Sequence, residues 1–187
     1  TIDFGENYVS KGGNILSGTL NIVYDGKYRD TNSGFYSYIT FNNFSINSNL
    51  IKGVKSVEGK GLQNGYLTFE ISTVDTIILA NNGGTIMWNS DRVRSWIQGM
   101  DTPINWTDDI YSITGYASGV TKNNNPYTID IISPVIIKMN CKYITQGTLE
   151  LKVSNKPKVT IDYGDGICDN KANVSVYDKN VEIILVY

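Results

Sequence analysis

Residues 141–187 read CKYITQGTLELKVSNKPKVTIDYGDGICDNKANVSVYDKNVEIILVY, and this stretch decides the fold class. Apolar side chains alternate with polar ones over residues 148–153 and again over residues 158–163, with a turn-forming Asn-Lys-Pro sequence between the two runs. A period of two residues is typical of half-buried β-strands, because successive side chains of a strand point to opposite faces of the sheet. The pattern returns over residues 172–176 and 181–187, so the stretch predicts four consecutive antiparallel strands.

The only two cysteines of the chain, Cys141 and Cys168, lie in this stretch. If the first two strands pair as a hairpin, their register sets Cys141 opposite residues 169–171, with Cys168 beside them. A disulfide requires such proximity of the two Cα atoms. We therefore predict a disulfide between Cys141 and Cys168, with two free cysteines packed as small apolar residues as the alternative.

The rest of the chain also consists of short apolar-rich runs separated by polar turns. Thirteen Tyr and eighteen Gly with only four Pro favour many strands joined by tight turns. Phe41 and Phe44 interrupt the alternation and predict a bulge between them, Pro134 predicts an edge position or a bulge, and residues 58–64 are predicted to form a Gly-rich loop. The predicted strands cover residues 15–24, 35–46, 50–57, 66–71, 75–80, 85–99, 110–120 and 127–139.

About a dozen strands connected mostly by hairpins must curl, close on themselves or split into two packed sheets. The expected fold is therefore all-β, an antiparallel meander that forms either a two-sheet sandwich or one large curled sheet or barrel. A chain of 187 residues, of which 41% are hydrophobic, is long enough for one sizeable core. We predict a single domain over residues 1–187, with a division near residues 100–108 as the alternative.

Several kinds of chemistry are excluded by the residue types that the chain lacks. It contains no histidine, which removes Ser-His-Asp and Cys-His catalysis and His-ligated zinc. Its sixteen basic and eighteen acidic residues are scattered singly, so there is no basic stripe for nucleic acid and no polybasic patch for a membrane surface. We therefore expect no cofactor, no nucleic-acid partner and no enzyme activity.

Two groups of residues remain as candidate binding sites. Asp162, Asp165 and Asp169 lie among glycines in one loop and are a candidate calcium site, although turn formation explains the same residues. Tyr and Trp side chains on an exposed sheet face can stack on sugar rings, whereas most strand aromatics pack in cores. The candidates for such a carbohydrate platform are Trp88, Trp96, Tyr36 and Tyr38.

Several segments also carry a family resemblance. They are RSWIQGMDT at 94–102, DDIYSITG at 108–115, the Cys141 segment with QGTL at 146–149, IDYGDGICDN at 161–170, TIDFG at 1–5 and KYRD at 27–30. Together these segments resemble uncharacterised lipoproteins of the Bacteroidetes cell envelope. The resemblance implies export and a lipid anchor on an upstream cysteine, and it carries no assigned activity; the loop after Gly5 departs from the family pattern because it lacks a cysteine.

The sequence thus predicts a non-catalytic binding or structural module of an exported, lipid-anchored cell-envelope protein. The expected location is periplasmic or outer-membrane-anchored, including the cell surface, with membrane contact only through the upstream anchor. A disulfide agrees with such an oxidising compartment. The expected partner is a glycan or another envelope protein. The alternatives are a carbohydrate-binding module and an envelope hydrolase with two carboxyl groups held about 5 to 10 Å apart.

Overall fold

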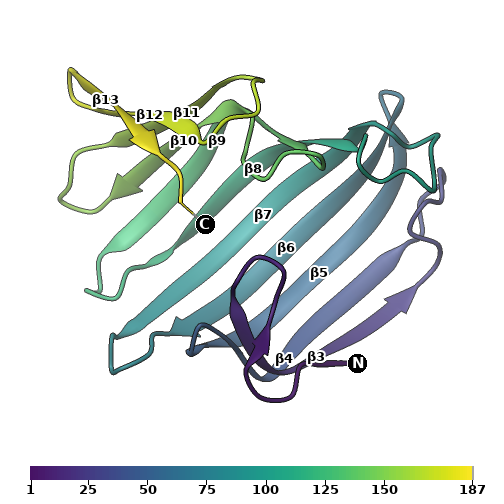
Figure 1. The fold of residues 1–187 in the computed structure, drawn as a ribbon, viewed down its shortest axis with the longest axis horizontal. Coiled ribbons are helices and arrows are strands. Elements are labelled where there is room, and N and C mark those ends of the chain that lie inside the picture. Colours follow the sequence, from purple (N-terminus) through teal and green to yellow (C-terminus); the bar gives the residue numbers. More distant parts are fainter. Residues whose placement is uncertain (187) are drawn as a thin grey trace.

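The computed structural model describes residues 1–186 and contains thirteen β-strands in one sheet (Figure 1). From β3 to β13 each strand pairs antiparallel with the next, while β1 and β2 both pair with β3. No helix in the described part of the chain is long and apolar enough to cross a membrane. The predicted all-β antiparallel meander is confirmed, and Tyr187, the end of the last predicted strand, lies outside the described residues.

The strands are β1 Ile2–Asp3, β2 Tyr8–Val9, β3 Ile15–Asp25, β4 Tyr36–Ile46, β5 Asn49–Gln63, β6 Tyr66–Ile78, β7 Thr85–Gln98, β8 Ile110–Val120, β9 Pro126–Lys138, β10 Gln146–Val153, β11 Val159–Asp165, β12 Lys171–Val176 and β13 Lys179–Ile184.

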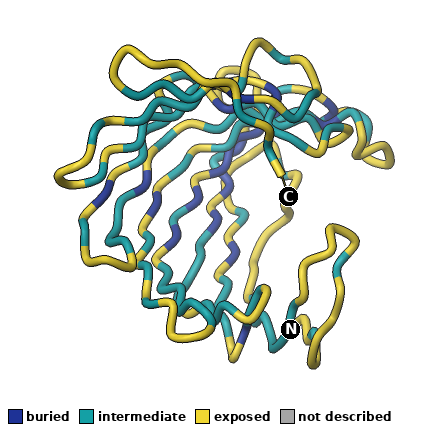
Figure 2. Tube along the Cα trace, turned by 60° about the vertical axis from the view of Figure 1, so that its left-hand side comes forward, coloured by how far each residue is buried: buried dark blue, intermediate teal, exposed yellow. Residues whose placement is uncertain are grey.

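The sheet curls but does not close. The strands β10 to β13 and the N-terminal segment with β1 and β2 both lie in front of the central strands in Figure 1, and Figure 2 shows the two ends of the sheet on the same open side. β1 and β13 each have a single neighbour, so both remain free edges. Of the predicted arrangements, one large curled sheet is the one that forms.

The central strands have a buried inner face and an exposed outer face. Along β6, Phe69 and Ile71 are buried, whereas Glu70 and Val74 between and beyond them are exposed. Figure 2 shows buried positions recurring across neighbouring strands. We call the face of Phe69 the inner face and the face of Glu70 the outer face.

One end of the inner face is sealed by the loop 26–35, which connects β3 to β4. Tyr28 of this loop stacks on Phe69 with 4.7 Å between ring centroids, and the Arg29 guanidinium lies 4.4 Å from the centre of the Trp96 ring. The Arg94 guanidinium donates a hydrogen bond of 2.6 Å to the Tyr28 hydroxyl and lies 4.9 Å from the centre of the Phe69 ring. The buried cluster beneath the loop consists of Val57, Leu67, Phe69, Ile71 and Trp96.

The predicted Gly-rich loop at residues 58–64 is wrong, because β5 continues to Gln63. Its glycines give room to the loop 26–35 instead of forming a turn. A Cβ on Gly59 would lie 2.9 Å from the Cβ of Phe35, and one on Gly61 would lie 2.6 Å from the backbone oxygen of Thr31. The predicted separate strand at residues 75–80 is likewise wrong, because residues 75–78 continue the single strand β6, which ends at Ile78.

Two predicted irregularities are confirmed as bulges. The register between β4 and β5 shifts between Thr40 and Ser45, and Asn43 takes a φ of 46° within this segment. Pro134 lies where the registers of β9 with both of its neighbours shift. Because β9 has strands on both sides, Pro134 is accommodated by a bulge and not by an edge position.

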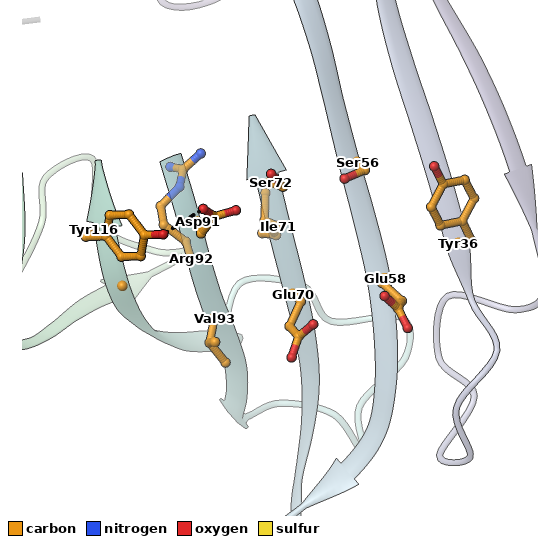
Figure 3. A pocket seen from close by; sticks show the side chains of 11 residues that line it. Tyr36, Ser56, Glu58, Glu70, Ile71, Ser72, Asp91, Arg92, Val93 and Tyr116 are labelled. Carbon is orange, nitrogen blue, oxygen red and sulfur yellow. Dashed lines mark hydrogen bonds between the residues drawn. The ribbon is translucent and has the colours of Figure 1, made fainter. Parts of the chain in front are cut away.

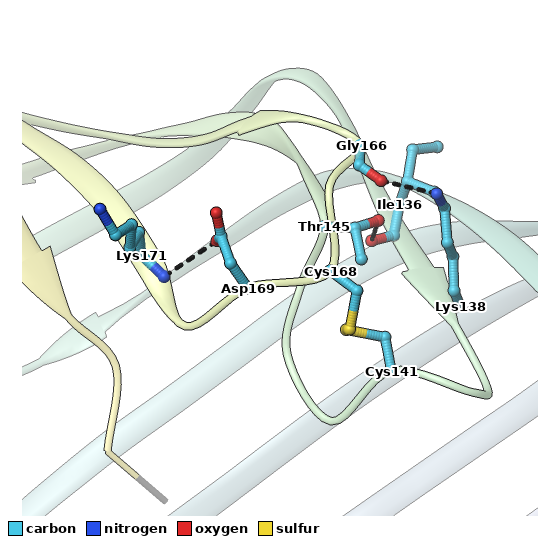
Figure 4. The surroundings of a disulfide bond; sticks show 8 residues. All are labelled: Ile136, Lys138, Cys141, Thr145, Gly166, Cys168, Asp169 and Lys171. Carbon is cyan, nitrogen blue, oxygen red and sulfur yellow. Dashed lines mark hydrogen bonds between the residues drawn. A yellow bond between two sulfur atoms is a disulfide. The ribbon is translucent and has the colours of Figure 1, made fainter.

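The predicted disulfide is also present. Cys141, in the loop before β10, is bonded to Cys168, in the loop between β11 and β12 (Figure 4). A second link lies beside it, because the Lys138 ammonium donates a hydrogen bond of 2.6 Å to the backbone oxygen of Gly166. The two loops are thus tied together at the end of the sheet where β9 ends and β10 begins.

Replacing both cysteines by serine should lower the free energy of unfolding. The bond closes a loop between residues 27 positions apart, for which chain entropy in the unfolded state predicts a loss of about 3.5 kcal/mol. Urea unfolding of the Cys141→Ser, Cys168→Ser variant against the wild type measures this difference. A loss below about 1 kcal/mol would show that the bond constrains the unfolded chain far less than its spacing implies.

The assignment of the two faces can be tested on β6. Phe69→Ala should cost about 3 to 5 kcal/mol, because it leaves a cavity under the loop 26–35. Val74→Ala, at an exposed position of the same strand, should change stability by less than about 0.5 kcal/mol. Equal losses for the two variants in urea unfolding would contradict the assignment.

Candidate binding surfaces

The centre of the inner face is polar. Lys55 on β5 lies opposite Thr73 on β6, and Thr73 lies opposite Ser90 on β7. Asp75 follows Thr73 by two residues and Arg92 follows Ser90 by two residues, so both side chains share this face. We call these five residues the central polar cluster.

Several groups of this cluster are buried without a hydrogen-bond partner among the described residues. Ser90 is 1% exposed and Thr73 is 6% exposed, and neither hydroxyl oxygen has a partner. Asp75 Oδ1 and Arg92 Nε are buried and unpartnered as well. Each such group typically costs about 1 to 3 kcal/mol. The cluster therefore offers hydrogen-bonding capacity that the fold itself does not use.

The charged side chains of the cluster form no ion pairs within residues 1–186, and their charges do not sum to zero. No ion pair joins Asp75 to Lys55 or Arg92 in the described part of the chain. Burial lowers the pKa of Lys55, and the nearby Arg92 and Arg94 lower it further. Burial also raises the pKa of Asp75, against the opposing effects of Lys55 and Arg92. With all three side chains charged, two cations and one carboxylate leave the cluster with one positive charge.

An apolar hollow of about 230 Å³ lies beside the cluster on the inner face. Among the described residues that line it, Arg92 alone carries a charge. Beyond it, Leu151 on β10 and Val159 on β11 pair with each other and are half-buried, so the apolar surface continues along the C-terminal strands. The lining residues are Trp88, Arg92, Ile113, Tyr116, Ala117, Ile129, Ile131, Val135, Ile137, Ile144 and Leu149.

A second hollow, of about 390 Å³, lies mainly on the outer face (Figure 3). Tyr36 on β4 and Tyr116 on β8 flank it, with serine hydroxyls and carboxylates between them. Glu58 and Glu70 lie opposite each other on neighbouring strands, and both bind the Lys60 ammonium, at 2.8 and 2.9 Å. The Tyr116 hydroxyl donates a hydrogen bond of 3.0 Å to Asp91, which raises the pKa of Tyr116.

The four aromatic candidates for a carbohydrate platform do not share a face. Trp96 is 2% exposed in the core, and Trp88 is half-buried in the inner hollow. Tyr36 and Tyr38 are 43% and 37% exposed and lie on the outer face of β4, opposite Glu58 and Ser56. The structure instead places Tyr36 at one end of the outer hollow and Tyr116, which the sequence did not single out, at the other end.

The three aspartates proposed as calcium ligands are in the loop and strand beside the disulfide. Asp162 accepts a hydrogen bond of 2.9 Å from the Gly164 N–H, and Asp169 accepts one of 3.1 Å from the Lys171 N–H, which Figure 4 shows. Both contacts are of the kind by which aspartate shapes turns. No group of three or more His, Cys, Asp or Glu side chains within residues 1–186 is arranged to hold a metal ion.

Lys55 and Lys60 should titrate in opposite directions from the ordinary lysine pKa of 10.5. Burial lowers the pKa of Lys55, so its contribution to stability rises as the pH is raised through the folded-state pKa toward 10.5. Hydrogen bonds to Glu58 and Glu70 raise the pKa of Lys60, so its contribution is present below 10.5 and is lost at higher pH. NMR titration of the lysine ε-methylene signals measures both values, and a Lys55 pKa equal to or above that of Lys60 would contradict the environments described.

Comparisons with protein-family models, with curated proteins and with solved structures find no match for this chain. Any inference about function therefore rests on the two hollows and the central polar cluster.

Proposed function

We propose that this protein is a non-catalytic binding module that holds a small ligand against the inner face of its curled sheet. The observation that carries the proposal is the pair of buried, unpartnered hydroxyls of Thr73 and Ser90 in the polar cluster of Arg92, which itself lines an apolar hollow. Concave, mostly apolar sites with a few convergent polar groups are typical of ligand-binding surfaces. The backbone of the sheet is open on one side, where its two ends lie (Figure 2).

The carboxylates favour binding over hydrolysis. Hydrolysis of a glycosidic bond needs two carboxyl groups of different protonation on either side of the bond. Glu58 and Glu70 share the Lys60 ammonium, which is the arrangement of a surface ion-pair network. Asp108 and Asp109 are also engaged separately. Asp108 accepts a hydrogen bond from the Thr102 hydroxyl, and Asp109 accepts one from the Tyr111 hydroxyl.

An exported protein remains the proposal for location. The disulfide between Cys141 and Cys168 supports it, since such bonds persist in oxidising compartments. The membrane anchor and the cell-envelope setting rest on the family resemblance.

A second candidate function is carbohydrate binding on the outer face. The exposed rings of Tyr36 and Tyr116, with hydroxyls and carboxylates between them, support it. Tyrosine rings supply stacking surfaces for sugars, and carboxylates accept hydrogen bonds from sugar hydroxyls. This surface is open and its acidic groups are partly engaged by Lys60, so we place it second.

Removing the two buried hydroxyls should stabilise the ligand-free protein. Thr73→Val and Ser90→Ala replace unpartnered polar groups by apolar ones of similar shape, and the double variant should gain about 1 to 3 kcal/mol. Ser72→Ala, on the outer face of the same strand, is the matched control and should change little. A double variant that is less stable than the wild type in urea unfolding would show that the hydroxyls serve the fold.

The binding face can be located by methyl NMR during a screen of amphiphiles, glycans and short peptides. We expect a ligand that shifts the methyl signals of Ile129, Ile131 and Leu149 in the inner hollow while leaving the outer-face Val74 unchanged. The same ligand should bind the Thr73→Val, Ser90→Ala variant more weakly. Shifts confined to Val93 in the outer hollow would instead favour carbohydrate binding, and a screen without shifts on either face would favour a structural role.

A further inference from the structure

We propose that the ligand of the inner face is a single acyl chain with an anionic head group. The chain would lie in the apolar hollow and the head group at Arg92 and Lys55. This inference rests on the proposed function and adds the chemical class of the ligand.

The shape of the hollow favours a slender ligand. Its volume of about 230 Å³ is below the range of about 300 to 1,000 Å³ in which compact small molecules usually bind. The apolar surface nevertheless extends from Leu149 in the hollow to Ile161 on β11 and Val174 on β12, which are paired across the sheet. A flexible chain can follow such a stripe, whereas a bulky ring system would need a wider cavity.

The lining chemistry favours hydrocarbon over sugar. Nine of the eleven lining residues, all except Arg92 and Tyr116, have side chains without an acidic, basic or hydroxyl group. A sugar that entered the hollow would lose water from its hydroxyls without regaining their hydrogen bonds, which costs binding energy for each unpaired group. An acyl chain has no such groups and gains by leaving water.

The single charge at the hollow favours an anion. Arg92 lines both hollows, and its Nε is buried without a partner. Guanidinium groups bind carboxylate and phosphate oxygens through two parallel hydrogen bonds. Arg94, two residues further along this face of β7, already donates to the Tyr28 hydroxyl, so of these two arginines Arg92 is the one that remains available.

The neighbours of Arg92 complete a head-group site. Ser90 precedes Arg92 by two residues on β7. Thr73 on β6 lies opposite Ser90, and Lys55 on β5 lies opposite Thr73, so these three residues form one row across the sheet. The Lys55 ammonium can add a second positive charge to that of Arg92, while Ser90 and Thr73, 1% and 6% exposed, form the polar floor beneath the two cations. Asp75 offsets one of the two cations, so the site still favours one negative charge.

Quenching of tryptophan fluorescence by a chain-brominated stearate tests this directly, because Trp88 lines the hollow. Trp96 is in the sealed core and Trp106 is exposed in the loop between β7 and β8, so Trp88→Phe identifies the signal that comes from the hollow. We expect saturable quenching in the wild type and its loss in Trp88→Phe. A competing fatty acid that is shorter by two methylenes should bind about tenfold more weakly, because it buries less apolar surface.

The head-group site is tested by comparing substitutions of basic residues on the inner face with one on the outer face. Arg92→Met and Lys55→Met should each weaken binding of the brominated stearate about tenfold or more. Lys52→Met, on the outer face of the same strand as Lys55, should leave binding unchanged. A lysophosphatidic acid competitor shows whether a phosphate serves as well as a carboxylate, and displacement by either anion supports the proposal. If the brominated alcohol of the same chain length binds as tightly as the brominated stearate, the proposal of an anionic head group is overturned.

The outcomes separate this inference from the proposed function. If the brominated stearate does not quench Trp88 but another ligand shifts the methyl signals of Ile129 and Ile131, the acyl-anion class is wrong and the inner binding face stands. If quenching persists unchanged in Trp88→Phe, the amphiphile binds elsewhere and the inference is overturned. If no ligand of any class perturbs the inner face, both proposals fail together.

Discussion

The structure depends on one constraint: an antiparallel sheet without helices has only itself and its loops to cover its apolar face. In the described part of the chain, the eleven strands β3 to β13 pair in sequential order and reduce the exposure of that face by curling. The loop 26–35 then seals one end, with Tyr28 stacked on Phe69 and clamped by Arg94. Beyond this seal the inner face includes apolar residues that are only half-buried, among them Trp88, Ile129 and Leu149. The curled sheet therefore has a limited core and an incompletely covered apolar face. An apolar ligand that moves from water onto this face would gain free energy.

The central polar cluster works against the stability of this open fold. Thr73 and Ser90 are buried among neighbouring strands with their hydroxyls unpaired, and Asp75 and Arg92 share a face without forming an ion pair. Apolar residues at these positions would suit the fold better. Natural proteins tolerate such local conflicts at functional sites. Because Arg92 of the cluster also lines the apolar hollow, the function proposed above would explain this cost in stability as a consequence of ligand binding.

The sequence predicted what depends on local alternation, and it missed what depends on register across strands. The period-two pattern of residues 141–187 was sufficient for the last four strands and placed Cys141 near Cys168. Gly59 and Gly61 were misread as loop residues, because their role is to admit a loop that is distant in sequence. Lys55 lies 18 residues before Thr73 and Thr73 lies 17 residues before Ser90, and only the ladder pairs of the folded sheet bring the three into one row. Alternation also could not show that Tyr36 and Trp88 face opposite sides.

The most direct measurement of the central claim is a crystal structure of the protein grown with a chain-brominated stearate, with bromine located by its anomalous scattering. We expect bromine between Ile129, Ile131 and Leu149, and the carboxylate of the ligand within hydrogen-bond distance of the Arg92 guanidinium. Bromine bound only on the outer face, between Tyr36 and Tyr116, would contradict the claim that the inner face of the curled sheet is the binding surface.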